Sequence, residues 1–220
     1  MKGRCAIKII VTAGPTIERI DPVRFISNRS TGVMGYKVAE VASRKRHAVT
    51  LVSGPTKLKP PRVKKFISIE TADDLLRVLK KEIKKADCLV MCAAVGDFRV
   101  ASAARRKIKR KESLLLKLVP TKDILKELAK HKRDKLFVGF SLETEDLVKN
   151  SRKKLRPKKL DLIVANRLTN RHNPFGNNRL GVSIIDARGN SIYISNESKS
   201  YIAQVLLDKI QELWYLRKEG

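Results

Sequence analysis

The chain has 220 residues, 42% of them hydrophobic, and 49 Lys and Arg residues against 22 Asp and Glu give a formal net charge of +27. No apolar run approaches the roughly 18 residues of a membrane-spanning helix, which excludes a protein of that class. The length suits one α/β domain over residues 1–220. Because no targeting segment is recognisable, we expect a cytoplasmic protein.

The positive charge concentrates in two runs, Arg105 to Lys111 and Lys149 to Lys159. An excess this large attracts polyanions, so nucleic acid is one candidate partner. However, aromatic residues make up only 5% of the chain, and none stands within the runs to stack on bases. A solvated lysine-rich surface and a site for a small anion are the other interpretations, and we expect any contact with nucleic acid to be non-specific.

The three cysteines, Cys5, Cys88 and Cys92, match no zinc-binding spacing. We interpret them as reduced thiols that pack in the core, not as catalytic or metal-binding groups.

Apolar patterning predicts an alternation of strands and helices. Strands are expected at 5–13, 48–55, 64–69, 87–95, 136–143 and 161–166, and a hairpin at 180–195 with its turn at 188–190. Helices are expected at 35–45, 71–86, 121–131 and 199–217, the second starting with a capping box of Thr71 and Asp74. Such alternation implies right-handed βαβ units and a Rossmann-like, doubly wound, mostly parallel sheet.

Polar groups gather in the loops that follow the predicted strands, at 12–16, 93–99, 140–145 and 165–176. In a doubly wound sheet the ligand binds at the carboxyl ends of the strands. These loops are therefore expected to form one site.

The stretch "STGVMG" (Ser30 to Gly35) stands where a helix is about to begin. Ser30 and Thr31 are expected to cap that helix near Gly32, leaving backbone N–H groups and the helix dipole to attract phosphate. The spacing of Gly32 and Gly35 matches only the second half of the dinucleotide-binding fingerprint. An ordinary N-cap is the alternative interpretation.

Six motifs follow one another along the chain: "TAGPTIERIDPVRFISNRSTGVMG" (12–35), "VTLVSGP" (49–55), "CAAVGDFR" (92–99), "KIK" (107–109), "GFSLET" (139–144) and "DLIVAN" (161–166). In this order they closely resemble phosphopantothenoylcysteine synthetase, the ligase of coenzyme A biosynthesis. In many bacteria this synthetase is fused behind a flavin-dependent decarboxylase, and the chain looks like the synthetase portion alone.

The resemblance implies a two-step reaction. The carboxylate of 4′-phosphopantothenate attacks the α-phosphate of CTP and expels pyrophosphate; the amine of L-cysteine then attacks the mixed anhydride and releases CMP. Mg²⁺ is expected to help neutralise the phosphates. The resemblance also implies a homodimer in which a basic flap, the hairpin-like segment from Arg99 to Val119, covers the partner's site. A separate decarboxylase is a further expected partner.

The resemblance also implies roles for individual residues. Catalytic roles fall to Asn28 and to Lys107, with Lys109 as the alternative in the basic run. Nucleotide contacts are expected from Gly14, Ser30, Thr31, Gly32, Ala93, Asp97, Lys107, Lys109 and Phe140, and substrate contacts from Arg24, Asn28 and Asn166. Asp97 is also the candidate metal ligand, because a carboxylate that follows a buried strand is costly without a partner.

Each role has a structural alternative. Arg24 can pair with Asp21 or Glu18, Asn28 can form an Asx turn or a cap, and Asp97 can cap a loop. Phe140 can pack in the core, and Lys107 can be one surface lysine among many.

The chain departs from the family pattern at three places. Val33 replaces a usual Lys, Arg167 a usual Asp, and Pro120 and Lys122 exchange their usual order. The sequence does not separate CTP from ATP. Two rival functions remain at this point: a nucleotide-dependent oxidoreductase of the Rossmann class and a basic nucleic-acid-binding module.

Overall fold

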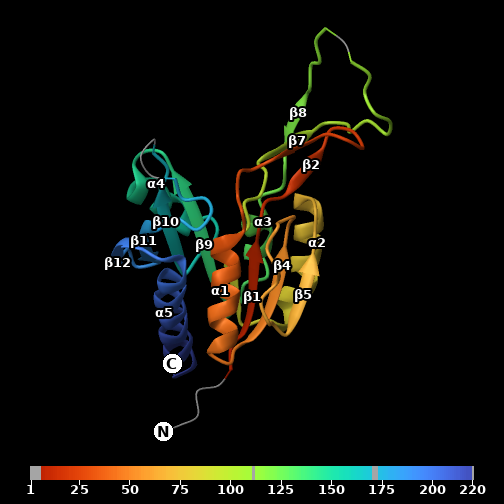
Figure 1. Ribbon diagram of the computed structural model, residues 1–220. Helices are drawn as coiled ribbons and strands as arrows, with labels where there is room; N and C mark the ends of the chain where they lie inside the picture. Colours follow the sequence, from red (N-terminus) through yellow and green to blue (C-terminus); the bar gives the residue numbers. More distant parts are fainter. Residues whose placement is uncertain (1–5, 111, 170–172, 220) are drawn as a thin grey trace.

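The computed structural model describes residues 6–110, 112–169 and 173–219. An eight-stranded sheet forms its centre, in the order β12-β11-β10-β9-β6-β1-β4-β5 (Figure 1). The strands are β1 (Lys8–Ala13), β4 (Ala48–Ser53), β5 (Lys65–Ser68), β6 (Cys88–Met91), β9 (Leu136–Glu143), β10 (Leu162–Arg167), β11 (Leu180–Asp186) and β12 (Ser191–Glu197). Cys5, where the first strand was predicted to start, lies outside the described residues.

Six neighbouring strands of the sheet, from β10 to β5, run parallel, and the β11–β12 hairpin adds two antiparallel strands at one edge. The chain moves from β1 outward to β4 and β5, then returns to β6 on the other side of β1. The predicted doubly wound, mostly parallel sheet is confirmed, and its topological switch point lies between β1 and β6.

Alternate residues of the central strands pack on opposite faces of the sheet. On β6, Cys88 and Val90 join one core cluster, whereas Leu89 and Met91 join the other. Both faces are therefore buried, which explains why these strands read as continuous apolar runs.

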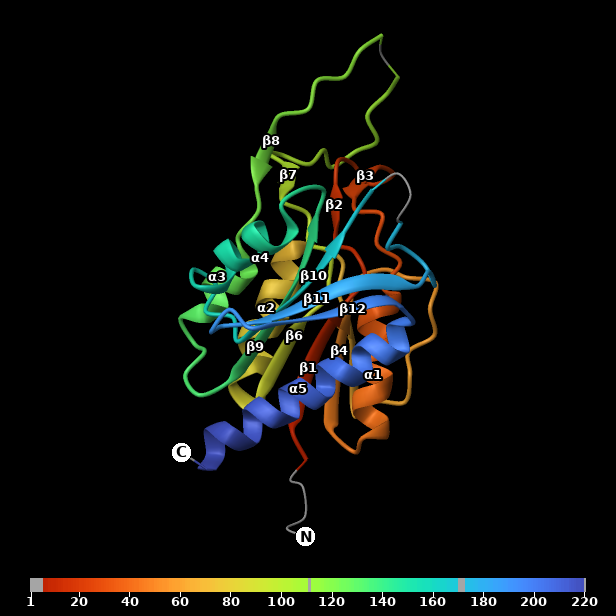
Figure 2. The ribbon, with the colours of Figure 1, turned by 90° about the vertical axis from the view of Figure 1, so that its left-hand side faces the viewer.

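The helices form a layer on each face of the sheet (Figure 2). Residues of α1 (Val33–Arg44) and α5 (Lys199–Glu219) pack in the first cluster. Residues of α2 (Ala72–Glu82), its 3₁₀ extension η1 (Ile83–Lys85), α3 (Ile124–Ala129) and α4 (Leu147–Leu155) pack in the second. Among the described residues, no helix is long and apolar enough to cross a membrane.

The Thr71–Asp74 capping box is confirmed, with both reciprocal hydrogen bonds at 3.1 Å. Other predicted bounds were too wide: the strand predicted at 87–95 ends at Met91, and the helix predicted at 121–131 begins after Asp123, whose carboxylate caps it. Helix α4 was not predicted at all. Its residues belong to a run dominated by charge, in which Ser151 and Leu155 are the buried positions.

Two small antiparallel pairs extend beyond the main sheet at its carboxyl end. They are β2 (Ile17–Arg19) with β3 (Phe25–Ser27), and β7 (Phe98–Val100) with β8 (Leu118–Pro120). The second pair carries the flap, residues 98–120, which projects away from the sheet in Figure 1. The predicted hairpin from Arg99 to Val119 is therefore present.

Candidate active site

Two cavities lie at the carboxyl ends of β6, β9 and β10. The larger has a volume of about 430 Å³, and its lining combines apolar residues with four charged ones, Asp97, Lys122, Asp123 and Lys158. The smaller, about 180 Å³, has a mostly apolar lining with Asn166 and Lys199 among its polar members. Ala93 and Phe140 line both cavities, so the two are neighbouring compartments of one site.

Backbone contacts at the switch point hold the loop after β6 against the loop after β1. The amide of Ala93 donates to Thr12 Oγ1 at 3.0 Å, and the amide of Ala94 donates to the carbonyl of Gly14 at 2.9 Å. The Thr16 amide in turn donates to the Ala94 carbonyl at 3.0 Å. Two loops that the sequence placed in one site therefore meet directly.

Asn28 joins this arrangement from the loop after β3. Its Nδ2 donates to the Ala94 carbonyl at 3.0 Å, and the residue is exposed. Neither an Asx turn nor a helix cap accounts for that bond. Asn28 thus lies next to the smaller cavity, which Ala94 lines, and a ligand there can use its amide oxygen as an acceptor.

The opening of α1 differs from the prediction. Gly32 is its N-cap, with a φ of 80°, and no side chain caps the helix. The Ser30 hydroxyl instead accepts from the Gly32 amide at 3.3 Å, and the Thr31 hydroxyl accepts from the Gly176 amide at 3.1 Å. The expectation that Ser30 and Thr31 cap α1 was wrong. Their hydroxyl oxygens accept hydrogen bonds from Gly32 and Gly176, not from amides inside the first turn of the helix.

The departure at Val33 has a structural explanation. Val33 is the first residue of α1 and only 8% of its surface is exposed, because it packs with the core. It offers no contact to phosphate.

Asp97 is exposed, so the argument that its carboxylate would be costly to bury was wrong. It lines the larger cavity, and no hydrogen bond or ion pair engages its carboxylate in the part of the chain that the structure describes. One free carboxylate fits Mg²⁺, which commonly takes one or two protein carboxylates and completes its shell with phosphate and water oxygens. The described residues contain no group of three side chains that could hold a metal alone.

Three charged residues that line the larger cavity, Lys122, Asp123 and Lys158, were not predicted as site residues. Lys158 pairs with Asp123 at 3.2 Å, and Lys122 lies 3.6 Å from Asp73 while remaining largely exposed. Lys122 therefore lines the cavity even though its order with Pro120 is exchanged. Lys158 was not singled out from the sequence because it is one of several lysines in the basic run 149–159.

Asn166 and Phe140 lie where the sequence placed them. Asn166, near the end of β10, lines the smaller cavity. Phe140 lines both cavities and also packs against the apolar core, so core packing is confirmed and the nucleotide contact stays a prediction. At the end of β10, Arg167 donates from Nε to the Thr144 carbonyl at 3.3 Å.

Arg24 adopts the alternative that the sequence left open. Its Nη1 donates to Asp21 Oδ2 at 2.7 Å and to the Ile108 carbonyl at 3.2 Å. Asp21 also accepts from the amides of Val23 and Ile108, at 2.7 and 3.1 Å. Burial opposes ionisation, but these backbone hydrogen bonds and the guanidinium hold the pKa of Asp21 below its usual value. The arrangement fastens the flap to the β2–β3 turn.

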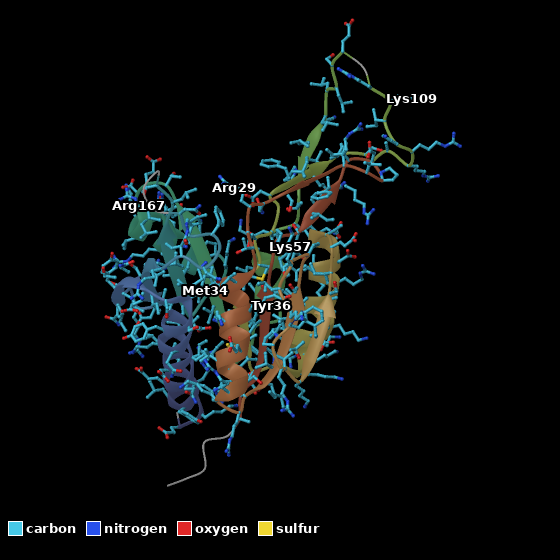
Figure 3. All side chains as sticks on the ribbon, in the orientation of Figure 1. Arg29, Met34, Tyr36, Lys57, Lys109 and Arg167 are labelled. Atoms are coloured by element: carbon cyan, nitrogen blue, oxygen red, sulfur yellow. The ribbon has the colours of Figure 1, made fainter. Side chains whose placement is uncertain are left out.

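The flap lysines lie away from the cavities of their own chain. Lys107 and Lys109 are exposed, and neither lines either cavity. Figure 3 shows Lys109 on the projecting flap, well separated from Arg29 and Met34. The glycine-bearing loop and the flap lysines were expected to meet on one triphosphate; within one chain they do not.

The cysteines lack reactive thiolates. Cys88 is fully buried and Cys92 partly so, and both are free. Burial raises the pKa of both thiols. Cys5 lies outside the described residues.

Fold and cavities together define a Rossmann-like α/β domain with a ligand site of two compartments at the switch-point edge of its sheet. The family model described as DNA/pantothenate metabolism flavoprotein C-terminal domain matches residues 5–213. The chain belongs to this family, which confirms the resemblance drawn from the sequence motifs.

Individual relatives agree with this assignment. The coenzyme A biosynthesis bifunctional protein CoaBC of Bacillus subtilis is 38% identical over 207 residues, which are 93% of this chain and 51% of that protein. The crystal structure of the C-terminal domain of a CoaBC has a TM-score of 0.81 at 35% identity and covers 94% of this chain and 95% of that one. A cysteine/cysteine sulfinic acid decarboxylase from an unknown prokaryotic organism is 38% identical over 209 residues, 94% of this chain and 58% of that protein. The chain thus spans about half the length of these curated relatives.

Proposed function

We propose that the chain is a phosphopantothenate–cysteine ligase that uses CTP. The observation that carries the proposal is the pair of adjoining cavities, one with two lysines and two aspartates in its lining, the other mostly apolar, which share Ala93 and Phe140. The reaction needs a phosphate-rich nucleotide and a flexible acyl chain to meet at one point. Family membership and the likeness to CoaBC support the same function.

The nucleotide occupies the larger cavity in this proposal. Lys122 and Lys158 supply positive charge for its phosphates, and Asp97 would hold a Mg²⁺ ion. The ion supplies charge neutralisation when bound. The apolar lining of the smaller cavity accommodates the pantothenate chain, and Asn166 gives that cavity a hydrogen-bonding group.

Both chemical steps then occur beside the shared wall. In the first, a carboxylate oxygen of 4′-phosphopantothenate forms a bond to the α-phosphorus, and the bond from that phosphorus to the bridging oxygen breaks, releasing pyrophosphate. In the second, the cysteine nitrogen bonds to the acyl carbon, the bond to the CMP oxygen breaks, and the nitrogen loses a proton. Asn28, held by Ala94, orients the acyl group. No side-chain nucleophile is required.

The flap completes the site of a second copy. Lys107 and Lys109 line neither of the two cavities of their own chain. Exposed apolar side chains accompany them on the flap and its neighbouring hairpin: Val23, Phe25, Phe98, Leu114, Leu115 and Leu118. An apolar surface of this kind is typical of an interface. We infer a homodimer in which Lys107 neutralises the α-phosphate in the partner's site.

A pyrophosphate-release assay tests the function. The purified chain is given 4′-phosphopantothenate and Mg²⁺ with CTP or ATP, with and without L-cysteine. We expect pyrophosphate with CTP in both cases and the amide product only with cysteine. No pyrophosphate from either nucleotide would overturn the proposal, whereas carbon dioxide released from cysteine or cysteine sulfinic acid without nucleotide would favour the activity in the decarboxylase relative's name.

Two variants test the assigned roles. Lys107→Gln is expected to slow pyrophosphate release by roughly a hundredfold, because the charge that develops on the phosphate loses its partner. Asn28→Asp is expected to retain more of that first step than of amide formation. Lys149→Gln, an exposed lysine of α4, is the matched control. The reverse pattern would contradict the assignment.

A further inference from the structure

Lys199, the first residue of α5, buries its side-chain nitrogen. Only 7% of the residue is exposed, and it lines the smaller cavity. Its Nζ donates to the Pro174 carbonyl at 2.7 Å and also to the Gly176 carbonyl. No carboxylate forms an ion pair with it anywhere in the described ranges.

A lysine is an unfavourable choice at this position. The N-terminal end of a helix repels positive charge, and a buried ammonium without a counter-ion loses its hydration. Burial alone lowers the pKa of Lys199 to about 8. The charged side chains on adjoining segments are Arg29 and the Arg179–Glu197 pair, whose atoms are 3.1 Å apart. The compensation for burying Lys199 is thus its hydrogen bonding to segment 173–179.

That segment connects three parts of the site. Pro174 and Phe175 line the smaller cavity. The Gly176 amide donates to Thr31 Oγ1 at 3.1 Å, and the Arg29 guanidinium lies 5.8 Å from the centroid of the Phe175 ring. The segment therefore bridges α5 and the loop that leads from Asn28 into α1.

We propose that Lys199 is a positioning residue that fastens segment 173–179 against the smaller cavity and so fixes the part of its wall that Pro174 and Phe175 form. The consequence of this contact for catalysis rests on the proposed function. Its effect on the position of segment 173–179 does not. With the wall in place, the acyl chain is held for attack. Without it, 4′-phosphopantothenate binds more weakly while the chemical groups stay intact.

The lowered pKa gives this contact a pH signature. When the segment opens, Lys199 enters water and regains its ordinary affinity for protons, with a pKa of 10.5. Between about 8 and 10.5 the open form therefore binds more protons than the closed form. Opening of the segment therefore becomes less favourable as the pH rises from about 8 to 10.5. Below about 8, Lys199 is protonated in both forms and makes the opening equilibrium no more dependent on pH. Both protonation states retain enough N–H groups for two carbonyls.

Limited chymotrypsin digestion measures the opening directly, as cleavage after Phe175 relative to cleavage after Leu115, which is 97% exposed on the flap. At pH 9, Lys199→Met is expected to be cut at Phe175 about tenfold faster than the wild type, because two hydrogen bonds are lost. Lys199→Arg keeps donors and is expected to stay within about threefold of the wild type. Lys209→Met, on the same helix and paired only with exposed Glu212, is the matched control.

Two further measurements separate positioning from general stability. A tenfold change in opening corresponds to about 1.4 kcal/mol, so the melting temperature of Lys199→Met should fall by no more than about 6 °C. From pH 8 to 10, relative cleavage should fall in the wild type and stay level in both Lys199 variants. In the pyrophosphate assay, Lys199→Met should raise the KM for 4′-phosphopantothenate at least fivefold and change kcat less than twofold.

Equal cleavage of Lys199→Met and the wild type would overturn the proposal, as would equal pH dependence in both. A wild type that is inactive in the assay but protected at Phe175 would refute the ligase function and leave the contact standing.

Discussion

Gly35 stands where α1 passes β1 at close range. A Cβ built there would lie 2.8 Å from the Thr12 carbonyl oxygen and 2.6 Å from Ala13 Cβ. Thr12 also holds the loop after β6 through its hydroxyl. The motif "STGVMG" therefore ends in a residue that sets how deeply the helix sits on the sheet, as the last glycine of a dinucleotide fingerprint does.

We expect Gly35→Ala to lower the free energy of unfolding by about 1–3 kcal/mol, because the added methyl group overpacks a contact with backbone. Urea denaturation measures the change. Gly96→Ala is the matched control, since its Cβ would meet nothing nearer than 3.5 Å. Equal unfolding free energies for wild type and Gly35→Ala would show that α1 can shift to make room.

The sequence predicted the residues of the candidate site that lie at the ends of strands. Ala93, Phe140 and Asn166 meet because parallel neighbouring strands end at the same edge, and the alternation of strands and helices already implied that edge. Lys158 and Lys199 could not be found in this way. Among 49 Lys and Arg residues, a single lysine gives no signal until burial or a cavity distinguishes it.

At the scale of elements, the base of the flap is fixed by a small polar cluster. Asp21, only 2% exposed, receives hydrogen bonds from Arg24 and Ile108. The Ala104 amide adds a bond of 2.8 Å to the Ile20 carbonyl. The flap is thus attached at its base while its far part extends from the molecule (Figure 1).

Asp21→Asn is expected to loosen this attachment, because the amide keeps the size of the carboxylate but loses its charge and one acceptor oxygen. Hydrogen exchange at the Ile108 amide should accelerate by about tenfold or more. Asp73→Asn, at an exposed carboxylate 3.6 Å from Lys122, is the control and should leave Ile108 protected. An unchanged Ile108 rate in Asp21→Asn would place the attachment elsewhere.

The same contact carries a pH dependence. Although burial alone would raise it, the pKa of Asp21 is held below its ordinary 3.8 by hydrogen bonds to the carboxylate. Its stabilising effect is therefore fully present above 3.8 and is lost as pH falls through the lower pKa of the folded state. Protection of Ile108 in the wild type should be constant above 3.8 and decline as the pH falls from 3.8 through the lower pKa of the folded state. In Asp21→Asn this decline should be absent.

Sequence patterns predicted the elements that carry long apolar runs and missed those that do not. β9 matches its expected range, 136–143, because its apolar run is bounded by polar residues. The three-residue strands β2 and β3 have no such run, and tertiary contacts stabilise them: the Ile17 amide donates to the Glu70 carbonyl at 2.9 Å. Helix α4 was missed because charge concealed its two buried positions.

At the scale of the whole molecule, Lys107 and Lys109 of the flap line neither cavity of their own chain. The cavities face the carboxyl edge of the sheet, and the flap with its lysines projects beyond them (Figure 3). If two copies exchange flaps, each site contains Asn28 from one chain and Lys107 from the other. Such an arrangement makes the site incomplete in a monomer.

Mixing two defective variants tests this arrangement. Asn28→Asp and Lys107→Gln homodimers each carry a defect in both sites, so amide formation is expected to be low in either alone. After subunit exchange, half of a random mixture consists of heterodimers, and in each of these one site has both residues intact. The mixture should recover about a quarter of wild-type activity, corresponding to one functional site in every four.

The control is a mixture in which both defects lie in the same chain, Asn28→Asp with Lys107→Gln, combined with wild type. There each heterodimer site carries one defect, and only wild-type homodimers are expected to contribute, which again gives about a quarter of full activity. If each chain used its own flap, that control would instead retain about half, and the two single variants would not complement at all. Failure of the single variants to complement, together with half activity in the control, would therefore place Lys107 in the site of its own chain and require the flap to fold back.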